Sequence, residues 1–325
     1  MARDYRIDSI KGLLMILVIL GHYITGLDNS NIINHGVMGC IYVFHMPLFI
    51  LISGYFTKHP SQQTPQQMWR GVGKIFLTLV VFHVLNAVRF YLMFGNFMAP
   101  LSKFPYSVLW YLLCLIYWRI LLYYTPRRLL DKPALYLGLA LLLSLASGLT
   151  RLGLFLSIQR AMSFFFFFLL GFYYRQGAAN VPLWHNNKLH ALVAVVLLPL
   201  IFWLYPHCGN IMNGADYFGL QGLPAKIMIF ICSVAVSLLV FNLMRDVKWL
   251  RPIGKDSLFY YVYHMFIIIP LSYYLIQTYN WPRTLPFIVL YTAFTVILLW
   301  LMSKVKAFRW LVHPTIQLKK KTGNP

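Results

Sequence analysis

The chain has 325 residues, of which 60% are hydrophobic and only 11% are charged. Soluble domains carry about 25% charged residues, and all seven acidic residues here are aspartate, with no glutamate. The composition therefore excludes an ordinary soluble domain and indicates a surface that faces lipid. The net charge of +21 does not indicate nucleic-acid binding, because the basic residues stand in short loops between apolar stretches.

Ten apolar stretches reach or approach the roughly 20 residues that a helix needs to cross a bilayer. They run approximately over 10–27, 38–57, 73–95, 106–124, 134–149, 158–174, 189–205, 224–244, 256–276 and 285–304. Threaded alternately from a cytoplasmic N-terminus, they leave 21 of the 28 basic residues on the cytoplasmic side and five on the other. The positive-inside rule requires such a bias. The sequence therefore predicts an all-α, polytopic membrane bundle of about ten transmembrane helices, with both termini in the cytoplasm.

We expect residues 1–325 to form a single membrane-embedded domain, because no stretch is left over for a soluble one. Residues 319–325 are predicted to be a short polar cytoplasmic tail. The first stretch has a basic start and an apolar core, like a signal peptide. No small-residue cleavage site follows it, so we expect it to be retained as a signal anchor.

The first stretch also carries the strongest candidates for chemistry. Eleven residues separate Lys11 from His22, which is three turns plus about 20°, so both side chains lie on one helix face about 16 Å apart along the axis. Asp8 falls near the same stripe, and Arg6 stands just before it. An ionisable face at membrane depth is expected to point into protein or a wet cavity. Imidazole is the usual general base near neutral pH, although His22 could instead be bonded between helices and Lys11 could snorkel at a helix end.

Three later side chains are candidate binding residues. His45 stands beside Pro47, which removes one backbone donor and opens room in the second stretch. His264 follows a run of tyrosines whose hydroxyls could satisfy it structurally. Arg160 could bind a polar acceptor outside or simply anchor its helix. The three histidines 22, 45 and 264 could converge, but no carboxylate or cysteine accompanies them at ligand spacing, so we expect no metal site.

Several short segments, spread in order over nearly the whole chain, together resemble one known family. They are Arg6-Ile7-Asp8-Ser9-Ile10-Lys11-Gly12 with Leu20-Gly21-His22, Phe44-His45-Met46-Pro47-Leu48-Phe49 with Ser53-Gly54-Tyr55, Trp110-Tyr111-Leu112, Arg160 through Phe168 to Leu170-Gly171-Phe172-Tyr173, and Ile253-Gly254-Lys255-Asp256-Ser257 with Tyr263-His264. Their order and spacing resemble the acyltransferase-3 family of integral-membrane acyltransferases, in particular its fucose 4-O-acetylase-like branch. That family has an arginine eleven residues before the histidine. Here the position is Lys11, which keeps the cation but not the bidentate grip of a guanidinium.

The resemblance implies an O-acetyltransferase that moves an acyl group, usually acetyl, from cytoplasmic acetyl-CoA or another acyl-CoA to a sugar hydroxyl. The acceptor would be a cell-surface or exported glycan or its lipid-linked precursor, and the location the inner (plasma) membrane of a bacterium. We expect His22 to act as general base with Lys11 beside the donor, and Arg6, Asp8, His45, Arg160 and His264 to bind substrate. A transient acyl-His22 is the second mechanism considered.

Two other functions remain open from the sequence alone. A transporter or flippase of a lipid-linked sugar could use the same intramembrane histidines, although no internal repeat of the kind common in transporters is evident. A non-catalytic membrane scaffold explains the buried lysine and histidine stripe least well.

Overall fold

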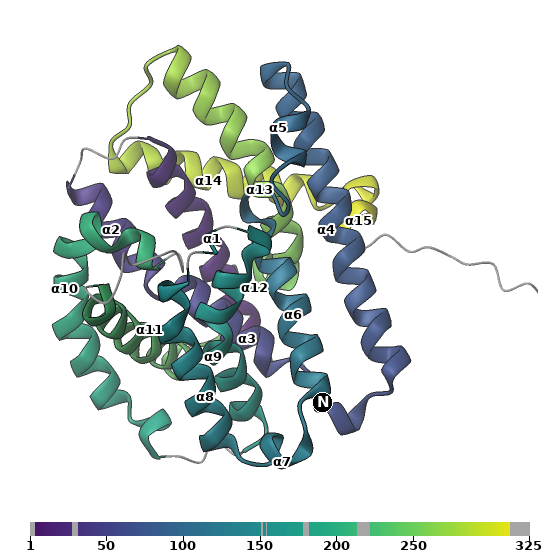
Figure 1. Ribbon diagram of the computed structural model, residues 1–325. Coiled ribbons are helices and arrows are strands. Elements are labelled where there is room, and N and C mark those ends of the chain that lie inside the picture. Colours follow the sequence, from purple (N-terminus) through teal and green to yellow (C-terminus); the bar gives the residue numbers. More distant parts are fainter. Residues whose placement is uncertain are drawn as a thin grey trace, which may run out of the picture.

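The computed structural model describes residues 4–27, 32–150, 152–153, 155–177, 182–212 and 222–312 (Figure 1). Within these ranges the chain forms helices and no strands. The α-helices are α1 (Tyr5–Leu27), α2 (Ile32–Tyr42), α3 (His45–Tyr55), α4 (Pro65–Phe94), α5 (Met98–Leu101), α6 (Trp110–Tyr124), α7 (Arg127–Leu130), α8 (Pro133–Ala146), α9 (Ile158–Arg175), α10 (Asn187–Met212), α11 (Leu223–Leu243), α12 (Arg251–Lys255), α13 (Ser257–Leu271), α14 (Leu285–Met302) and α15 (Lys306–Val312). Short 3₁₀ turns lie at Pro60–Gln62, Ser107–Leu109, Ser147–Leu149, Phe155–Ser157 and Pro182–His185, and a π-helical segment, Ser272–Thr278, continues α13.

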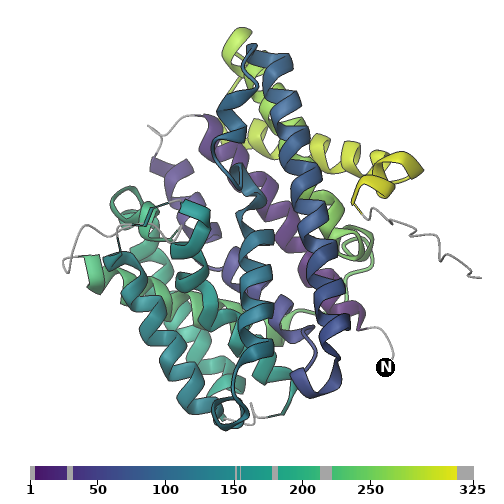
Figure 2. The same ribbon diagram turned by 45° about the vertical axis from the view of Figure 1, so that its right-hand side comes forward.

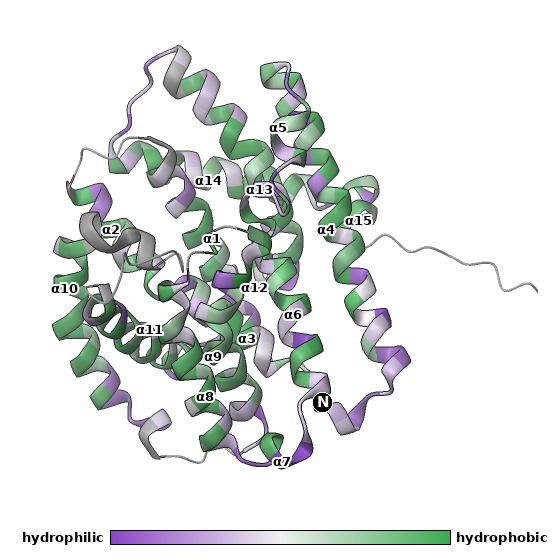
Figure 3. Cartoon of the chain, viewed as in Figure 1, coloured by the Kyte–Doolittle hydropathy of each residue, from purple (hydrophilic) through white to green (hydrophobic). Residues whose placement is uncertain are grey.

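The all-α polytopic architecture predicted from the sequence is confirmed. In the part of the chain that the structure describes, nine helical segments are long and apolar enough to cross a membrane, and Pro133–Leu149 is a shorter apolar helix at the position of the fifth predicted stretch. The predicted tail at 319–325 lies outside the described residues. Figure 3 shows hydrophilic residues gathered around α7 and the start of α4, at one end of the bundle. We call this end, which carries Lys58, Arg70, Arg127, Arg128 and Lys132, the basic end.

Helix α1 lies inside the bundle and packs against α2, α3, α11, α12, α13 and α14. Most of its side chains are buried, from Ile7 near its first turn to Ile24 near its end. The long helix α4, blue in Figure 2, runs along the edge of the bundle and packs against α6 and α13. The helix with the strongest candidate residues is therefore among the most buried spans in the described part of the chain.

Two helix crossings bring backbone against backbone at glycines of the recognised segments. Between α1 and α12, a Cβ on Gly254 would stand 1.7 Å from the carbonyl oxygen of Asp8, and one on Gly12 would stand 2.3 Å from that of Leu250. Between α3 and α9, a Cβ on Gly54 or Gly171 would stand 1.8 Å from a backbone oxygen of the other helix. Small residues allow such close approach of membrane helices, so these glycines fix the positions of the helices that carry His22 and His45.

The second predicted stretch, 38–57, is interrupted. Helix α2 ends at Tyr42, α3 begins at His45, and Phe44 between them has φ −129° and ψ −24°. The ring of Pro47 would clash with the carbonyl of Val43, four residues earlier, and offers it no N–H. That carbonyl instead accepts a hydrogen bond from the Ser233 hydroxyl of α11 at 2.5 Å. The helix is thus broken beside Pro47, and His45 lies directly at the break.

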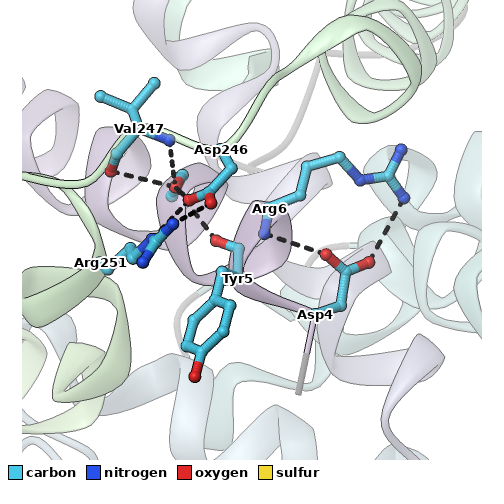
Figure 4. Close-up of polar contacts among 7 residues, drawn as sticks. Asp4, Tyr5, Arg6, Asp246, Val247 and Arg251 are labelled. Atoms are coloured by element: carbon cyan, nitrogen blue, oxygen red, sulfur yellow. Dashed lines mark hydrogen bonds and ion pairs between the residues drawn. The ribbon is translucent and has the colours of Figure 1, made fainter. Parts of the chain in front are cut away.

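A polar cluster fastens the start of α1 to the segment that precedes α12 (Figure 4). The Ser9 hydroxyl donates to the carbonyl oxygen of Val247 at 3.2 Å and accepts from its N–H at 2.9 Å. Arg251 forms an ion pair with Asp246 and lies over the ring of Tyr5, 4.5 Å from its centroid. The Arg251 guanidinium also donates hydrogen bonds to the Asp246 carboxylate, and these lower the pKa of that carboxyl below its usual value.

Candidate active site

A cavity of about 410 Å³ lies between α1, α3, α4, α6 and α13, and several cationic side chains line it. Lys11, Lys74 and Arg119 contribute the basic groups in its lining, and Ser53, Tyr111, Ser257 and Tyr261 contribute hydroxyls. Apolar side chains such as Phe49, Ile52, Leu112 and Leu115 form much of the remaining wall. The cavity thus offers an anion-binding side and an apolar side, a combination common in ligand sites.

Lys11 enters this cavity with its charge already partly balanced. Its ammonium lies 3.0 Å from a carboxylate oxygen of Asp8, one turn earlier on α1, and both side chains are largely buried. The buried pair explains how a lysine and an aspartate are tolerated on an enclosed helix face, because each offsets the desolvation of the other. Asp8 therefore lies beside Lys11, as predicted from the stripe.

Arg6 is not brought to the cavity. Its guanidinium pairs with Asp4 at 3.6 Å (Figure 4) and lies over the ring of Phe241 of α11, 5.6 Å from the centroid. Positions 6 and 11 differ by five residues, or about 140° around a helix, so they point to different neighbours. The structure groups Arg6 with α11 rather than with Lys11.

His22 and His264 face each other in the bundle. Their ring centroids are 5.2 Å apart with an angle of 36° between the planes. His264 is fully buried on α13, and its Nδ1 lies 2.7 Å from the carbonyl oxygen of Tyr261 and 3.2 Å from that of Tyr260. Lys11 and His22 therefore both point from α1 toward α13, on the shared face that their spacing predicts.

Tyr261 connects the cavity to the histidine pair. It lines the cavity, and its ring centroid lies 6.0 Å from that of His264. Its hydroxyl donates to the carbonyl of Val108, and its ring packs against Tyr111, whose own hydroxyl is bonded to Ser53. Hydrogen-bonded aromatic side chains therefore form the inner end of the cavity, and His264 lies directly beside them.

His45 and Arg160 lie away from the basic end of the bundle. The Nδ1 of His45 bonds to the carbonyl oxygen of Ile41 at 2.9 Å, and its ring packs edge-on against Tyr42 at 4.8 Å. His45 is buried and interacts electrostatically with His22. Arg160, in the first turn of α9, lies over the Trp110 ring at 5.1 Å and interacts electrostatically with Tyr42 and Tyr261. The three predicted histidines and Arg160 thus belong to one region, which borders Tyr261.

Two basic side chains of the cavity, Arg119 and Lys74, are not among the site residues predicted from the sequence. Arg119 lies inside a predicted span, and an ionisable residue at membrane depth is by default a functional candidate, so this signal could have identified it. Its Nε is buried and has no hydrogen-bond partner in the described ranges. Lys74 is an exposed residue in the N-terminal part of α4. No sequence signal separates it from the other basic residues there.

Lys226 is a further buried cation, and it is not among the site residues predicted from the sequence. It lies near the start of α11, and its ammonium donates to the Ser163 hydroxyl of α9 at 2.5 Å.

Among the residues that the structure describes, no group of three or more histidine, cysteine, aspartate or glutamate side chains could hold a metal ion.

The chain matches, over residues 4–304, a protein family described as an acyltransferase domain. It is also similar to nodulation protein NolL of Sinorhizobium fredii (strain NBRC 101917 / NGR234), with 38% identity over 82 residues, which are 24% of this chain and 22% of that protein. The chain thus spans about a fifth of the length of that relative. No solved structure matches the chain.

Proposed function

The chain belongs to the acyltransferase family that it matches over residues 4–304, and on that premise we propose that this multi-pass membrane protein is an O-acetyltransferase. It moves an acetyl group from cytoplasmic acetyl-coenzyme A to a hydroxyl of a cell-surface or exported glycan, or of the lipid-linked precursor, at the inner membrane of a bacterium. The observation that carries the proposal is the cavity that joins three basic side chains to Tyr261, followed by the facing rings of His264 and His22.

The donor enters from the basic end. Lys11, Lys74 and Arg119 bind its phosphate groups, because ammonium and guanidinium groups form charge-assisted hydrogen bonds with phosphate oxygens. A volume of about 410 Å³ suits the narrow pantetheine arm and its thioester rather than the whole cofactor, so the nucleotide part remains at the basic end. The apolar wall accommodates the arm, and the thioester lies at the Tyr261 end of the cavity.

The acceptor reaches the histidines from the opposite side, past His45 and Arg160. His22 removes the proton from the acceptor hydroxyl while the oxygen attacks the thioester carbonyl. The new C–O bond forms, the C–S bond breaks, and His22 returns the proton to the leaving sulfur, so that the imidazole ends neutral. General-base catalysis of this kind typically contributes about 10²- to 10⁴-fold. The alternative is a covalent acyl-His22 intermediate. The His22 nitrogen attacks the thioester, a C–N bond forms as the C–S bond breaks, and the ring proton goes to the sulfur. The acceptor oxygen then forms the C–O bond as the C–N bond breaks, and the hydroxyl proton goes to His22.

The test is transfer of labelled acetyl from acetyl-coenzyme A to glycan by the purified protein in proteoliposomes. His22→Ala should abolish transfer while the variant still inserts and retains its melting temperature. His59→Ala is the matched control, because His59 lies in a loop and bonds to Ser61. Full acetyl transfer by His22→Ala would refute the role of His22 as general base. Movement of a lipid-linked sugar across the bilayer without acetyl transfer would favour a flippase.

The donor site has a separate test. Arg119→Gln should raise the KM for acetyl-coenzyme A, and it should leave the KM for S-acetylpantetheine unchanged, because that donor carries the thioester and arm without phosphates. A variant that loses both donors equally would place Arg119 in a structural role. Arg70→Gln is the control, because Arg70 belongs to the basic end of the bundle and does not line the cavity.

A further inference from the structure

The second imidazole, His264, has its protonation pattern fixed by the backbone. A carbonyl oxygen only accepts hydrogen bonds, so the 2.7 Å contact between Nδ1 of His264 and the carbonyl of Tyr261 places the ring proton on Nδ1. A neutral imidazole has only one N–H, so Nε2 is left with a lone pair. This Nε2 is buried and has no hydrogen-bond partner among the described residues. A buried acceptor of this kind requires an explanation, since native proteins pair nearly all such atoms.

The groups around His264 distinguish its role from that of His22. His22 faces it from α1, Tyr111 and Tyr261 lie on the cavity side, and Arg89 of α4 interacts with it electrostatically. The Arg89 guanidinium is fixed, because its Nη1 donates at 2.6 Å to the carbonyl of Met265, the residue after His264. A fixed positive charge beside His264 opposes a second charge on that ring. The proton from the substrate therefore belongs on His22, and His264 stays neutral.

We propose that His264 is a positioning residue whose bare Nε2 accepts a hydrogen bond from His22 when His22 is protonated. This inference rests on the proposed function, in which His22 holds the acceptor proton between its removal from the hydroxyl and its return to sulfur. During that interval the N–H of the imidazolium points to Nε2 of His264, and no proton is transferred to His264. The bond is charge-assisted and therefore stronger than one between neutral groups. In other acyl-transfer sites a carboxylate accepts a hydrogen bond from the histidine that acts as base and stabilises its protonated form. Here the neutral ring of His264 has that role toward His22.

The test compares two substitutions of His264. His264→Phe keeps a planar ring and removes the acceptor, whereas His264→Gln keeps an acceptor at the position of Nε2. The Phe variant should lose about 10- to 100-fold in kcat, the loss of one hydrogen bond to a charged group, with the KM for acetyl-coenzyme A unchanged. The acid limb of its pH–rate profile should move to lower pH, because protonated His22 is no longer stabilised. The Gln variant should restore both readouts in part.

A structural role for His264 predicts a different pattern, with a lower melting temperature, changed KM and an acid limb that stays in place. An unmoved acid limb in His264→Phe would overturn the inference. If the Phe variant does not fold, His264→Leu takes its place, because it also removes the acceptor, and an acid limb that stays in place in His264→Leu would likewise overturn the inference. An inactive unmodified protein would refute the proposed function, whereas an active one with unaffected His264 variants would refute only this inference.

Discussion

Replacing Gly171 by alanine tests the closest contact between α3 and α9. The new Cβ would stand 1.8 Å from the Leu51 carbonyl oxygen, and ordinary contact begins at 3.4 Å, so the two helices must separate by about 1.6 Å at the crossing. The three atoms nearest to the new Cβ all belong to the backbone of Leu51, so no side-chain rotation can relieve the clash. Overpacking of a filled interior costs typically 1–3 kcal/mol, and a backbone clash of this depth belongs at or above the upper value. We therefore expect a loss of about 3 kcal/mol or more.

The assay is thermal unfolding of the purified protein in detergent. At about 2 °C per kcal/mol for a chain of this size, the melting temperature of Gly171→Ala should fall by roughly 6 °C or more. The control is Gly138→Ala in α8, where a Cβ meets nothing within 4 Å. Alanine favours a helix over glycine by up to about 1 kcal/mol, so this variant should melt at or slightly above the temperature of the native chain. Equal melting temperatures for the two variants would refute the backbone contact.

Three further predictions concern α1 and the cluster at its start. Lys11→Ala should raise the KM for acetyl-coenzyme A while Lys11→Arg should not, and a level donor KM in both variants would assign Lys11 to snorkelling alone. Ser9→Ala removes the hydrogen bonds with Val247 and should lower stability by about 1–3 kcal/mol, with faster amide exchange in 244–250; unchanged exchange would contradict it. The pKa of Asp246 is lowered by Arg251, so its stabilisation is present above the usual aspartate pKa of about 3.9 and is lost as the pH falls through the lowered pKa. Melting temperatures of the native chain and Asp246→Asn should therefore converge on acidification, and a constant gap down to about pH 3 would show that this ion pair has no linkage to folding.

The sequence predicted the helical architecture because the physical constraint of the bilayer acts on each stretch separately. A run of apolar residues long enough to cross hydrocarbon must form a helix, whatever surrounds it. The interruption of the second stretch was also foreseeable, since Pro47 acts on Val43 within the same segment. What the sequence did not contain was the partner of the freed Val43 carbonyl, because Ser233 lies 190 positions away.

In the candidate site, too, features within one helix could be predicted from the sequence, whereas contacts between helices could not. The common face of Lys11 and His22 follows from helix geometry alone, and Asp8 beside Lys11 follows from the same rule. The position of the His22 ring beside that of His264, and the presence of Arg119 and Lys11 in one cavity, depend on how α1, α6 and α13 are arranged. Arg6 was grouped with Lys11 because it is near in sequence, but its position around the helix directs it toward Phe241.

The glycines of the recognised segments were the least interpretable part of the sequence. Gly12, Gly54, Gly171 and Gly254 carry no chemistry, and nothing in their neighbours along the chain indicates which helix they meet. Their function appears only when the opposing carbonyl oxygens are seen at distances that exclude a Cβ.

The single, uninterrupted helix α1 joins the cation at one end of the proposed donor path to the imidazole at the other. An α-helix rises 1.5 Å per residue and resists stretching, so eleven residues set a span of about 16 Å. On the proposed donor path, helix α1 would therefore fix the distance between the phosphate-binding cation and the catalytic imidazole. Carriers whose phosphate and thioester are separated by a shorter or longer spacer would have one group out of register, and donor choice would be decided by length before any contact with the acyl chain.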